Sequence, residues 1–199
     1  MTDAALIQQY LNGEIGAFNT LVWRWEKPIF NFTYRIVGNE DTAKDICQTT
    51  FIRTYRELKK LREPEKFSSW IYRIALNLCR DELKKKKNRN TLYIEDLQTK
   101  SSSADSIMQM RDHNTKTPEE ACDHQQIGEI LKWALMALPE EQRVVVIMKQ
   151  YHGLKFTEIA EILKQPINTI KSRLYYGLRA LRKILVESKY SKEVLLHEM

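Results

Sequence analysis

Cysteine, glycine and proline are scarce in this chain, and each scarcity narrows what the protein can be. Its 199 residues include three cysteines, six glycines and five prolines. Cys47, Cys79 and Cys122 are odd in number, widely spaced and without a CxxC pair, which favours reduced, mostly buried thiols over a disulfide framework or a zinc site. The sequence also lacks a glycine-rich phosphate loop, paired carboxylates and a nucleophile–base set. We therefore expect no enzymatic activity, no cofactor and no metal.

Long apolar runs are missing as well. No segment approaches the ~18 consecutive apolar residues that a membrane-spanning helix needs. The beginning of the chain, MTDAALIQQYLNGE, has an acid and polar residues where a signal peptide has a basic and then an apolar segment. These features predict a cytoplasmic protein without stable membrane insertion. His113 and His124 have no neighbouring ligands that would support a metal site.

Charge is distributed unevenly along the chain. The net charge is +6, but residues 51–90 carry 13 basic and five acidic side chains, and residues 151–187 carry seven and three. Between these two basic blocks, residues 91–128 carry three basic and seven acidic side chains. Two basic blocks separated by an acidic one suggest two nucleic-acid contacts on one chain.

Residues 156–185 predict two helices joined by a tight turn. Apolar residues recur at i, i+3, i+4 and i+7 from Phe156 to Leu163, which is the spacing of one helical face. Pro166 ends that helix, because proline disfavours helical geometry in the preceding residue, and Asn168 can cap the next one. The second helix has an apolar face formed by Ile170, Leu174, Leu178, Leu181 and Leu185. This pattern is typical of a helix-turn-helix.

The opposite face of the second helix is hydroxylic, aromatic and cationic. It comprises Thr169, Ser172, Tyr176, Arg179 and Lys183, flanked by Lys171, Tyr175 and Arg182. An ordinary helical hairpin with a solvated basic face would show the same periodicity. The face carries no acid between Pro166 and Val186, and its side chains suit phosphates and base edges, so we favour DNA binding.

The first 58 residues predict three or four helices. Residues 2–11 form the first, and residues 15–37 form either one helix kinked at Pro28 or two helices. We expect the aromatic residues of this stretch to lie in the core: Trp23, Trp25, Phe30 and Phe32. Asn39 can cap the third helix, whose expected buried stripe is Ala43, Cys47, Phe51, Tyr55 and Leu58. Its far side holds Asp45, Gln48, Thr49, Ile52 and Arg56, where an isoleucine among polar residues hints at a partner surface, although single exposed apolar residues are common.

A longer helix follows the break at residues 61–65. Its expected core stripe is Phe67, Ile71, Ile74 and Leu78. A second stripe runs along the helix in a nearly straight line and comprises Lys66, Trp70, Arg73, Asn77, Arg80 and Lys84. It combines cations for phosphates, an amide for a base edge and a ring for stacking, which indicates nucleic-acid binding. The alternative is a solvated basic face with Trp70 tucked into the core.

The remaining segments complete an all-α chain of two small domains. Residues 1–90 form the N-terminal domain, residues 91–126 a flexible acidic linker, residues 127–187 a four-helix domain with the helix-turn-helix, and residues 188–199 a tail. Two helices before the helix-turn-helix, over residues 127–138 and 139–151, are expected to buttress it.

Three stretches, in this order, resemble the extracytoplasmic-function (ECF) group of bacterial sigma factors. NEDTAKDICQTTFIRTYREL resembles the helix of that family that binds polymerase, and FSSWIYRIALNLCRDELKKKK resembles the helix that opens and reads the minus-ten element. LPEEQRVVVIMKQYHGLKFTEIAEILKQPINTIKSRLYYGLRALRKIL resembles the domain that binds the minus-thirty-five element. The resemblance implies an initiation factor that directs core RNA polymerase to promoter DNA and has an anti-sigma factor as a further partner.

The resemblance also implies roles for matching residues. Asp45, Gln48 and Phe51 match the DxxQxxF pattern of the polymerase-binding helix, with Thr49 and Ile52 beside them. The family's pattern beside the melted strand is matched by Trp70, Tyr72, Arg73 and Asn77. The position where the family captures a flipped base corresponds to residues 61–69. The KSR of the family's recognition helix is matched by Lys171, Ser172 and Arg173.

The chain departs from the family pattern at four places. Thr49 replaces a usual glutamate, Lys155 replaces a capping Ser or Thr, Lys164-Gln165 replaces a turn that commonly contains glycine, and Tyr176 occupies an often basic position. An autonomous helix-turn-helix regulator that binds operators as a dimer is the alternative function. The second basic helix, the long linker and the lack of an evident dimerisation heptad speak against it.

Overall fold

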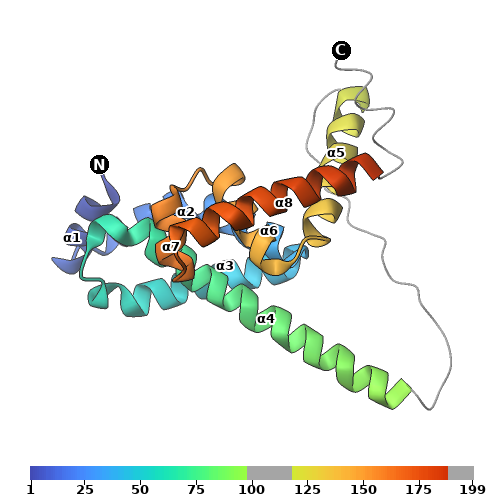
Figure 1. Ribbon diagram of the computed structural model, residues 1–199. Coiled ribbons are helices and arrows are strands. Elements are labelled where there is room, and N and C mark those ends of the chain that lie inside the picture. Colours follow the sequence, from blue (N-terminus) through green and yellow to red (C-terminus); the bar gives the residue numbers. More distant parts are fainter. Residues whose placement is uncertain (98–117, 188–199) are drawn as a thin grey trace.

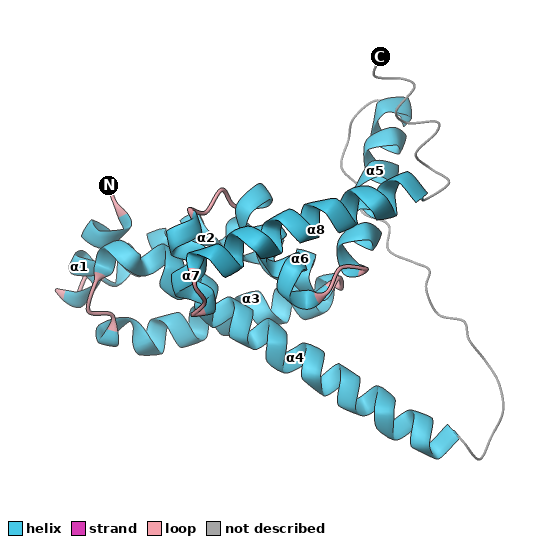
Figure 2. Cartoon of the chain, in the orientation of Figure 1, coloured by secondary structure: helices cyan, strands magenta, loops and turns pink. Residues whose placement is uncertain are grey.

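The computed structural model describes residues 1–97 and 118–187, and the regular elements in these two ranges are helices (Figures 1 and 2). The N-terminal half contains α1 (Asp3–Leu11), α2 (Ile15–Val37), α3 (Glu40–Glu57), the 3-10 turns η1 (Leu58–Lys60) and η2 (Pro64–Lys66), and α4 (Phe67–Leu97). The C-terminal half contains α5 (Pro118–Met136), α6 (Glu140–Val146), the π-helical η3 (Ile147–Tyr151), α7 (Phe156–Leu163) and α8 (Ile167–Glu187). The predicted all-α class is confirmed. Within the described ranges, every helix is too short or too polar to cross a membrane.

Helix ends in the N-terminal half follow the signals in the sequence. The hydroxyl of Thr2 accepts the backbone N–H of Ala5 at the start of α1, and Asn39 Oδ1 accepts the N–H of Thr42 at 2.9 Å at the start of α3. Between them α2 runs without interruption through Pro28, so this stretch is one helix rather than two. It ends at Gly38, whose φ of 75° is a left-handed conformation that glycine adopts without steric cost.

The core of the N-terminal half lies where α2 packs against α3 and α4. Ile29, Phe32 and Ile36 of α2 are fully buried, as are Phe67 and Ile71 of α4. The expected burial of Phe32 is therefore confirmed, and Trp25 and Phe30 pack against this core while half-buried.

The expected burial of Trp23 was wrong, because this side chain is 87% exposed. Trp23 precedes Trp25 by two residues, which places it about 200° away around the helix. Trp25 faces inward and meets the ring of Phe67 edge-on, with 5.8 Å between ring centroids. Burying one of these two tryptophans therefore exposes the other.

The buried face of α3 is rotated from the predicted one. Ala43, Cys47 and Leu58 are buried as expected, but Tyr55 is 49% exposed and Phe51 is half-buried. Ile46, Thr50 and Thr54 take the inner positions instead. The sequence pattern missed the two threonines because they are polar, yet the hydroxyl of Thr50 donates to the carbonyl of Ile46 at 2.7 Å, which lets it be buried at little cost.

The core of the C-terminal half is the continuous apolar run that spans α6 and η3. Residues 144–148 of this run are buried, and Ile159, Ile162 and Ile170 of α7 and α8 pack around them. Helix α8 approaches α6 most closely at Gly177, where a β-carbon would lie 2.8 Å from Cγ2 of Val146. The predicted four-helix unit with a helix-turn-helix is confirmed.

Helix covers both ends of the range predicted as a linker. Helix α4 continues to Leu97 and α5 begins at Pro118, whereas the prediction was residues 91–126. Neither glycine nor proline occurs between Phe67 and Leu97, so the sequence offers no signal that would end α4 at residue 90. Residues 98–117 and the predicted tail, residues 188–199, lie outside the described part of the chain.

The two halves pack against each other along a surface that we call the seam. On one side of it are α2 and α4, and on the other are α7, η3 and the beginning of α6, while the far end of α4 projects away from the body (Figure 1). At its centre, Tyr72 Oη lies 2.8 Å from Nδ1 of His152. Beside this pair, the guanidinium of Arg35 lies 4.2 Å from the ring centroid of Tyr151. The two predicted domains therefore pack against each other in this structure.

Gly177→Ala is expected to destabilise the C-terminal half by about 1–3 kcal/mol, because overpacking against Val146 outweighs the better helix propensity of alanine. Chemical unfolding monitored by circular dichroism would measure the change. Gly16→Ala is the matched control, since no atom lies within 4 Å of its added β-carbon and it should be neutral or slightly stabilising. Equal behaviour of the two variants would contradict the close crossing of α6 and α8.

The seam should weaken in acid. Burial, together with the charge of Arg35, lowers the pKa of His152 to about 4 from an ordinary value near 6.5. Between these values the unfolded chain holds a proton that the folded chain does not, so this contribution to stability is complete above pH 6.5 and is lost as the pH falls toward 4.

Urea unfolding at pH 7 and pH 5 should therefore show a larger loss for the wild type than for His152→Gln. The limit is one proton, or about 1.4 kcal/mol per pH unit. The variant keeps every other titrating group, so the difference between the two proteins isolates this imidazole. Parallel losses would mean that folding does not lower the pKa of His152.

Candidate nucleic-acid interface

Helix α8 presents its predicted polar face to solvent. Lys171, Ser172 and Arg179 are exposed, Tyr175 and Tyr176 are 64% and 55% exposed, and Thr169 is half-buried. The rings of the two tyrosines lie 5.5 Å apart and nearly perpendicular. The first acid on α8 is Glu187, at its last residue. The result is an acid-free, convex surface with cations, hydroxyls and rings.

The inner face of α8 sets this orientation and differs from the prediction at one position. Ile170 and Gly177 are buried, and Leu174, Leu181 and Ile184 pack against the core. Leu178, predicted on the apolar face, is 37% exposed. The close approach at Gly177 rotates α8 so that its inner face follows residues 170, 174, 177, 181 and 184.

Arg173 stands apart from the rest of the predicted recognition residues. Its guanidinium Nη2 donates to Glu141 Oε2 at 2.5 Å, and its side chain is only 22% exposed. The pair ties α8 to the beginning of α6 within the C-terminal half. In this arrangement Arg173 holds the recognition helix in place, while Lys171 and Ser172 face outward.

The turn before α8 forms without the glycine that is common in the family pattern. Lys164 ends α7 with a φ of 52°, a left-handed conformation that costs a non-glycine residue about 1 kcal/mol or more. At the other end of α7, the N–H of Lys155 donates to Glu158 Oε2 at 2.6 Å. The Glu158 carboxylate thus satisfies the N–H of Lys155, which is the half of a capping box that does not need a hydroxyl at the cap position.

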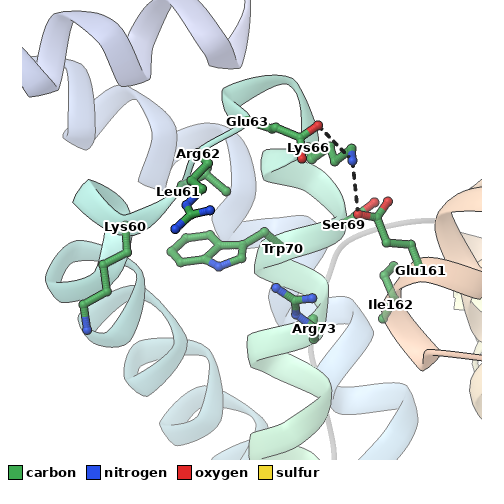
Figure 3. A pocket seen from close by; sticks show the side chains of 10 residues that line it. All are labelled: Lys60, Leu61, Arg62, Glu63, Lys66, Ser69, Trp70, Arg73, Glu161 and Ile162. Atoms are coloured by element: carbon green, nitrogen blue, oxygen red, sulfur yellow. Dashed lines mark ion pairs between the residues drawn. The ribbon is translucent and has the colours of Figure 1, made fainter.

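A second cationic surface surrounds a cavity of about 280 Å³ at the beginning of α4 (Figure 3). The cavity is lined by Lys60, Leu61, Arg62, Glu63, Lys66, Ser69, Trp70, Arg73, Glu161 and Ile162. Figure 3 shows the indole ring of Trp70 with Arg62 and Arg73 on either side of it. Trp70 is half-buried, with its ring centroid 6.0 Å from that of Phe67, so it rests on the core and also lines the cavity.

The predicted stripe on α4 continues beyond this cavity. Asn77 and Lys84 are exposed, and Arg73 and Arg80 are half-exposed. Lys66 forms ion pairs with Glu63 at 2.9 Å and Glu161 at 3.7 Å. The carboxylate of Glu63, followed by that of Glu161, raises the pKa of Lys66. Lys66 therefore stays charged at the beginning of this stripe.

Tyr72 lies off this stripe and is only 3% exposed. Its ring meets Phe32, Trp25 and His152 edge-on, with centroids 5.0, 5.7 and 5.2 Å apart. Burial raises the pKa of its hydroxyl. Of the predicted minus-ten residues, Tyr72 is the one that the structure separates from the others and encloses in the seam.

Helix α3 carries the predicted polymerase surface. Asp45 and Gln48 are exposed, Ile52 is 46% exposed, and Thr49 and Phe51 are half-buried. An exposed isoleucine among polar side chains thus lies on the face of α3 that points away from the core. Asp45, Gln48, Thr49 and Ile52 share this surface, whereas Phe51 packs against the core.

Three residues of the cavity lie outside both the predicted loop, residues 61–69, and the predicted stripe on α4. Lys60 immediately precedes that loop, and the basic sequence KKLR offered a signal for it. Glu161 and Ile162 come from α7, far away along the chain. Only the packing of the two halves brings them to the cavity, so no local pattern reveals them.

The buried thiols give no sign of reactivity. Burial raises the pKa of Cys47 to about 11 and that of Cys79 to about 12. Both are free thiols inside the core, and they remain protonated at neutral pH. In the part of the chain that is described, His, Cys, Asp and Glu form no group that could hold a metal ion.

Comparison with known proteins matches both halves of the chain to one family. Residues 21–89 match Sigma-70 region 2, and residues 128–181 match Sigma-70, region 4. ECF RNA polymerase sigma factor SigW of Bacillus subtilis is 33% identical over 90% of this chain and 94% of its own length. RNA polymerase sigma-H factor of Pseudomonas aeruginosa is 27% identical over 92% of this chain and 93% of its own.

Solved structures show the same fold at lower sequence identity. The sigma factor RpoE from Bartonella quintana, in complex with the anti-sigma factor NepR, aligns with a TM-score of 0.61 at 18% identity, covering 88% of this chain and all of that one. CnrH, in complex with the cytosolic domain of CnrY, aligns with a TM-score of 0.65 at 19% identity, covering 94% and 98%. Both sigma regions are matched in the family's order, and SigW is matched over nearly its full length. The chain belongs to the ECF group of RNA polymerase sigma factors.

Proposed function

We propose that this sigma factor docks on core RNA polymerase through α3, reads duplex minus-thirty-five DNA through α8 and helps to melt the minus-ten element through α4. The observation that carries this proposal is the presence of two cationic surfaces of different shape. One is the convex, acid-free face of α8, and the other is the cavity beside Trp70. The chain performs recognition and no covalent chemistry, and it acts in the cytoplasm, where polymerase and promoter meet.

The shape of α8 suits duplex DNA. A helix fits the major groove, where side chains reach base edges that distinguish all four base pairs. Arg179, Tyr175 and Tyr176 project from the exposed side of this helix. Ser172 and Lys171 add a hydroxyl and a cation for phosphate contacts. This surface therefore supports recognition of an intact double helix.

The cavity on α4 suits an unstacked base. It offers an indole ring for stacking, and the basic side chains around it suit the backbone on either side. Extruding a base from duplex DNA costs a few kcal/mol, and binding of the extruded base offsets this cost. Arg73 and Asn77 continue the surface along α4 for the strand that leaves the cavity. This arrangement supports strand opening rather than duplex reading.

We also propose an anti-sigma factor as a partner. RpoE from Bartonella quintana and CnrH, whose folds this chain shares, were each solved in a complex: RpoE with the anti-sigma factor NepR, and CnrH with the cytosolic domain of CnrY. The alternative of a dimeric operator-binding regulator is not favoured, because both sigma regions are matched in one chain.

The docking role of α3 can be tested by comparing two variants, in each of which aspartate replaces an exposed isoleucine. Ile52→Asp combined with Gln48→Ala should weaken binding to core polymerase at least tenfold in a quantitative pull-down, because a charge replaces an apolar contact. Ile15→Asp is the matched control, since Ile15 is 68% exposed and lies outside α3. Equal affinity of the double variant and the control would remove the assignment of α3.

The division of labour between α8 and α4 predicts opposite defects in the holoenzyme. Arg179→Ala should lower affinity for duplex containing the minus-thirty-five element by about 1–3 kcal/mol if the guanidinium contacts a base. Strand opening on promoters that are already bound should remain nearly normal. Asn77→Ala should leave duplex binding intact and reduce opening.

Permanganate footprinting of unpaired thymines, run beside a duplex-binding assay, separates these two effects. Lys27→Ala is a suitable control, because Lys27 is an exposed cation on α2, outside the proposed surfaces of α8 and α4. Proportional loss of binding and opening in both Arg179→Ala and Asn77→Ala would refute the proposed division.

A further inference from the structure

A second cavity, of about 480 Å³, is lined by residues of α2, α4 and the end of η3. Its volume lies within the range of about 300–1,000 Å³ that is usual for small-molecule sites. Its lining combines cations with aromatic rings: Arg24, Lys27 and Arg35 are the cations, and Trp25, Tyr72 and Tyr151 are the rings. The functions proposed above for α3, α4 and α8 do not use this cavity.

The most enclosed cation of the cavity is Arg35, which is half-buried. Its Nη1 donates to the backbone carbonyl of Asn31 at 3.2 Å, and its guanidinium lies 4.2 Å from the ring centroid of Tyr151. Among the described residues, no carboxylate forms an ion pair with it. A half-buried cation that is solvated by a carbonyl and a ring keeps several N–H donors that an anion can accept.

The other two cations lie at the exposed rim of the cavity. Arg24 forms an ion pair with Asp3, which also accepts the indole N–H of Trp25 at 3.0 Å. Lys27 forms no ion pair with the described part of the chain. Arg35 and Lys27 therefore supply two positive charges that the described residues do not neutralise.

The charge of the lining suits a phosphate. No described residue that lines this cavity is acidic, whereas the cavity at Trp70 includes Glu63 and Glu161. Two unpaired cations match a phosphate monoester, which carries about −1.5 to −2 charges near pH 7. Burial raises the pKa of the Tyr151 hydroxyl against a smaller opposing effect of Arg35, so the phenol stays protonated and can donate to a phosphate oxygen.

The aromatic walls suit a planar ring. Trp25 and Tyr151 are half-buried and line the cavity, and Tyr72 meets Trp25 edge-on with 5.7 Å between ring centroids. A flat ring can stack against such side chains irrespective of its exact substituents. We infer that this cavity is a binding site for a free nucleotide, with the phosphate held by Arg35 and Lys27 and the base against Trp25 and Tyr151. The site is separate from both proposed DNA surfaces and adds a ligand to them.

Equilibrium dialysis of the full-length protein against labelled adenosine 5′-monophosphate tests this inference. Adenosine and inorganic phosphate serve as matched partial ligands. The nucleotide should bind about tenfold or more tightly than either, because it engages the cations and the rings together. Phosphate binding as tight as that of the nucleotide would show an anion site without ring recognition, and absence of nucleotide binding would leave no site; either result overturns the inference.

Substitutions of Arg35 locate the bound nucleotide. Arg35→Gln should weaken nucleotide binding about tenfold, and Arg35→Lys, which keeps the charge without the planar fork, should fall between that variant and the wild type. Arg53→Gln is the matched control, because it makes the same change at an exposed position of α3 and should bind like the wild type. Circular dichroism checks that each variant is folded, and the comparison of the three ligands on the wild type does not depend on any variant.

Two further outcomes would overturn the inference. Equal losses in Arg35→Gln and Arg53→Gln would reduce nucleotide binding to net charge. Full affinity in Arg35→Gln, together with a loss in Arg73→Gln, would place the nucleotide in the cavity at Trp70 instead.

Discussion

The rotation of each helix about its own axis is the constraint on which the rest of this structure depends. A helix that buries one side must expose the other, and the side that packs best against apolar neighbours is the one that is buried. On α4, burial of Phe67, Ile71 and Cys79 turns Asn77 and Lys84 toward solvent. On α8, the close crossing at Gly177 does the same for Arg179. The exposure of the two predicted recognition surfaces thus follows from two packing solutions in the cores.

This coupling explains why the all-α class, the helix-turn-helix and most of the exposed site residues could be predicted from the sequence. Apolar side chains at helical spacing report the buried side directly, and the polar side follows by geometry. The prediction was wrong where the polarity of a side chain does not match its burial. Thr50 is polar yet buried, because its hydroxyl bonds to its own helix, and Trp23 is aromatic yet exposed, because Trp25 takes the inner position.

The seam could not be predicted, for a different physical reason. Its contacts join residues that are distant in sequence, such as Tyr72 with His152, and each half would satisfy its own helical pattern without them. Tyr72 illustrates the difficulty. It belongs to the pattern of the DNA-reading helix, but the structure buries it among rings from α2 and beside an imidazole from the other half. Local periodicity contains no information about which partner covers such a residue.

The composition of the seam suits a contact that must both form and break. Its centre is aromatic and includes an imidazole whose pKa is held low by burial, whereas its edges are ion pairs open to solvent. The apolar centre favours docking without demanding a particular charge partner. The solvated edges contribute little to stability. A seam that was strongly apolar throughout would hold the halves together permanently, and a purely ionic one would not hold them together at physiological salt.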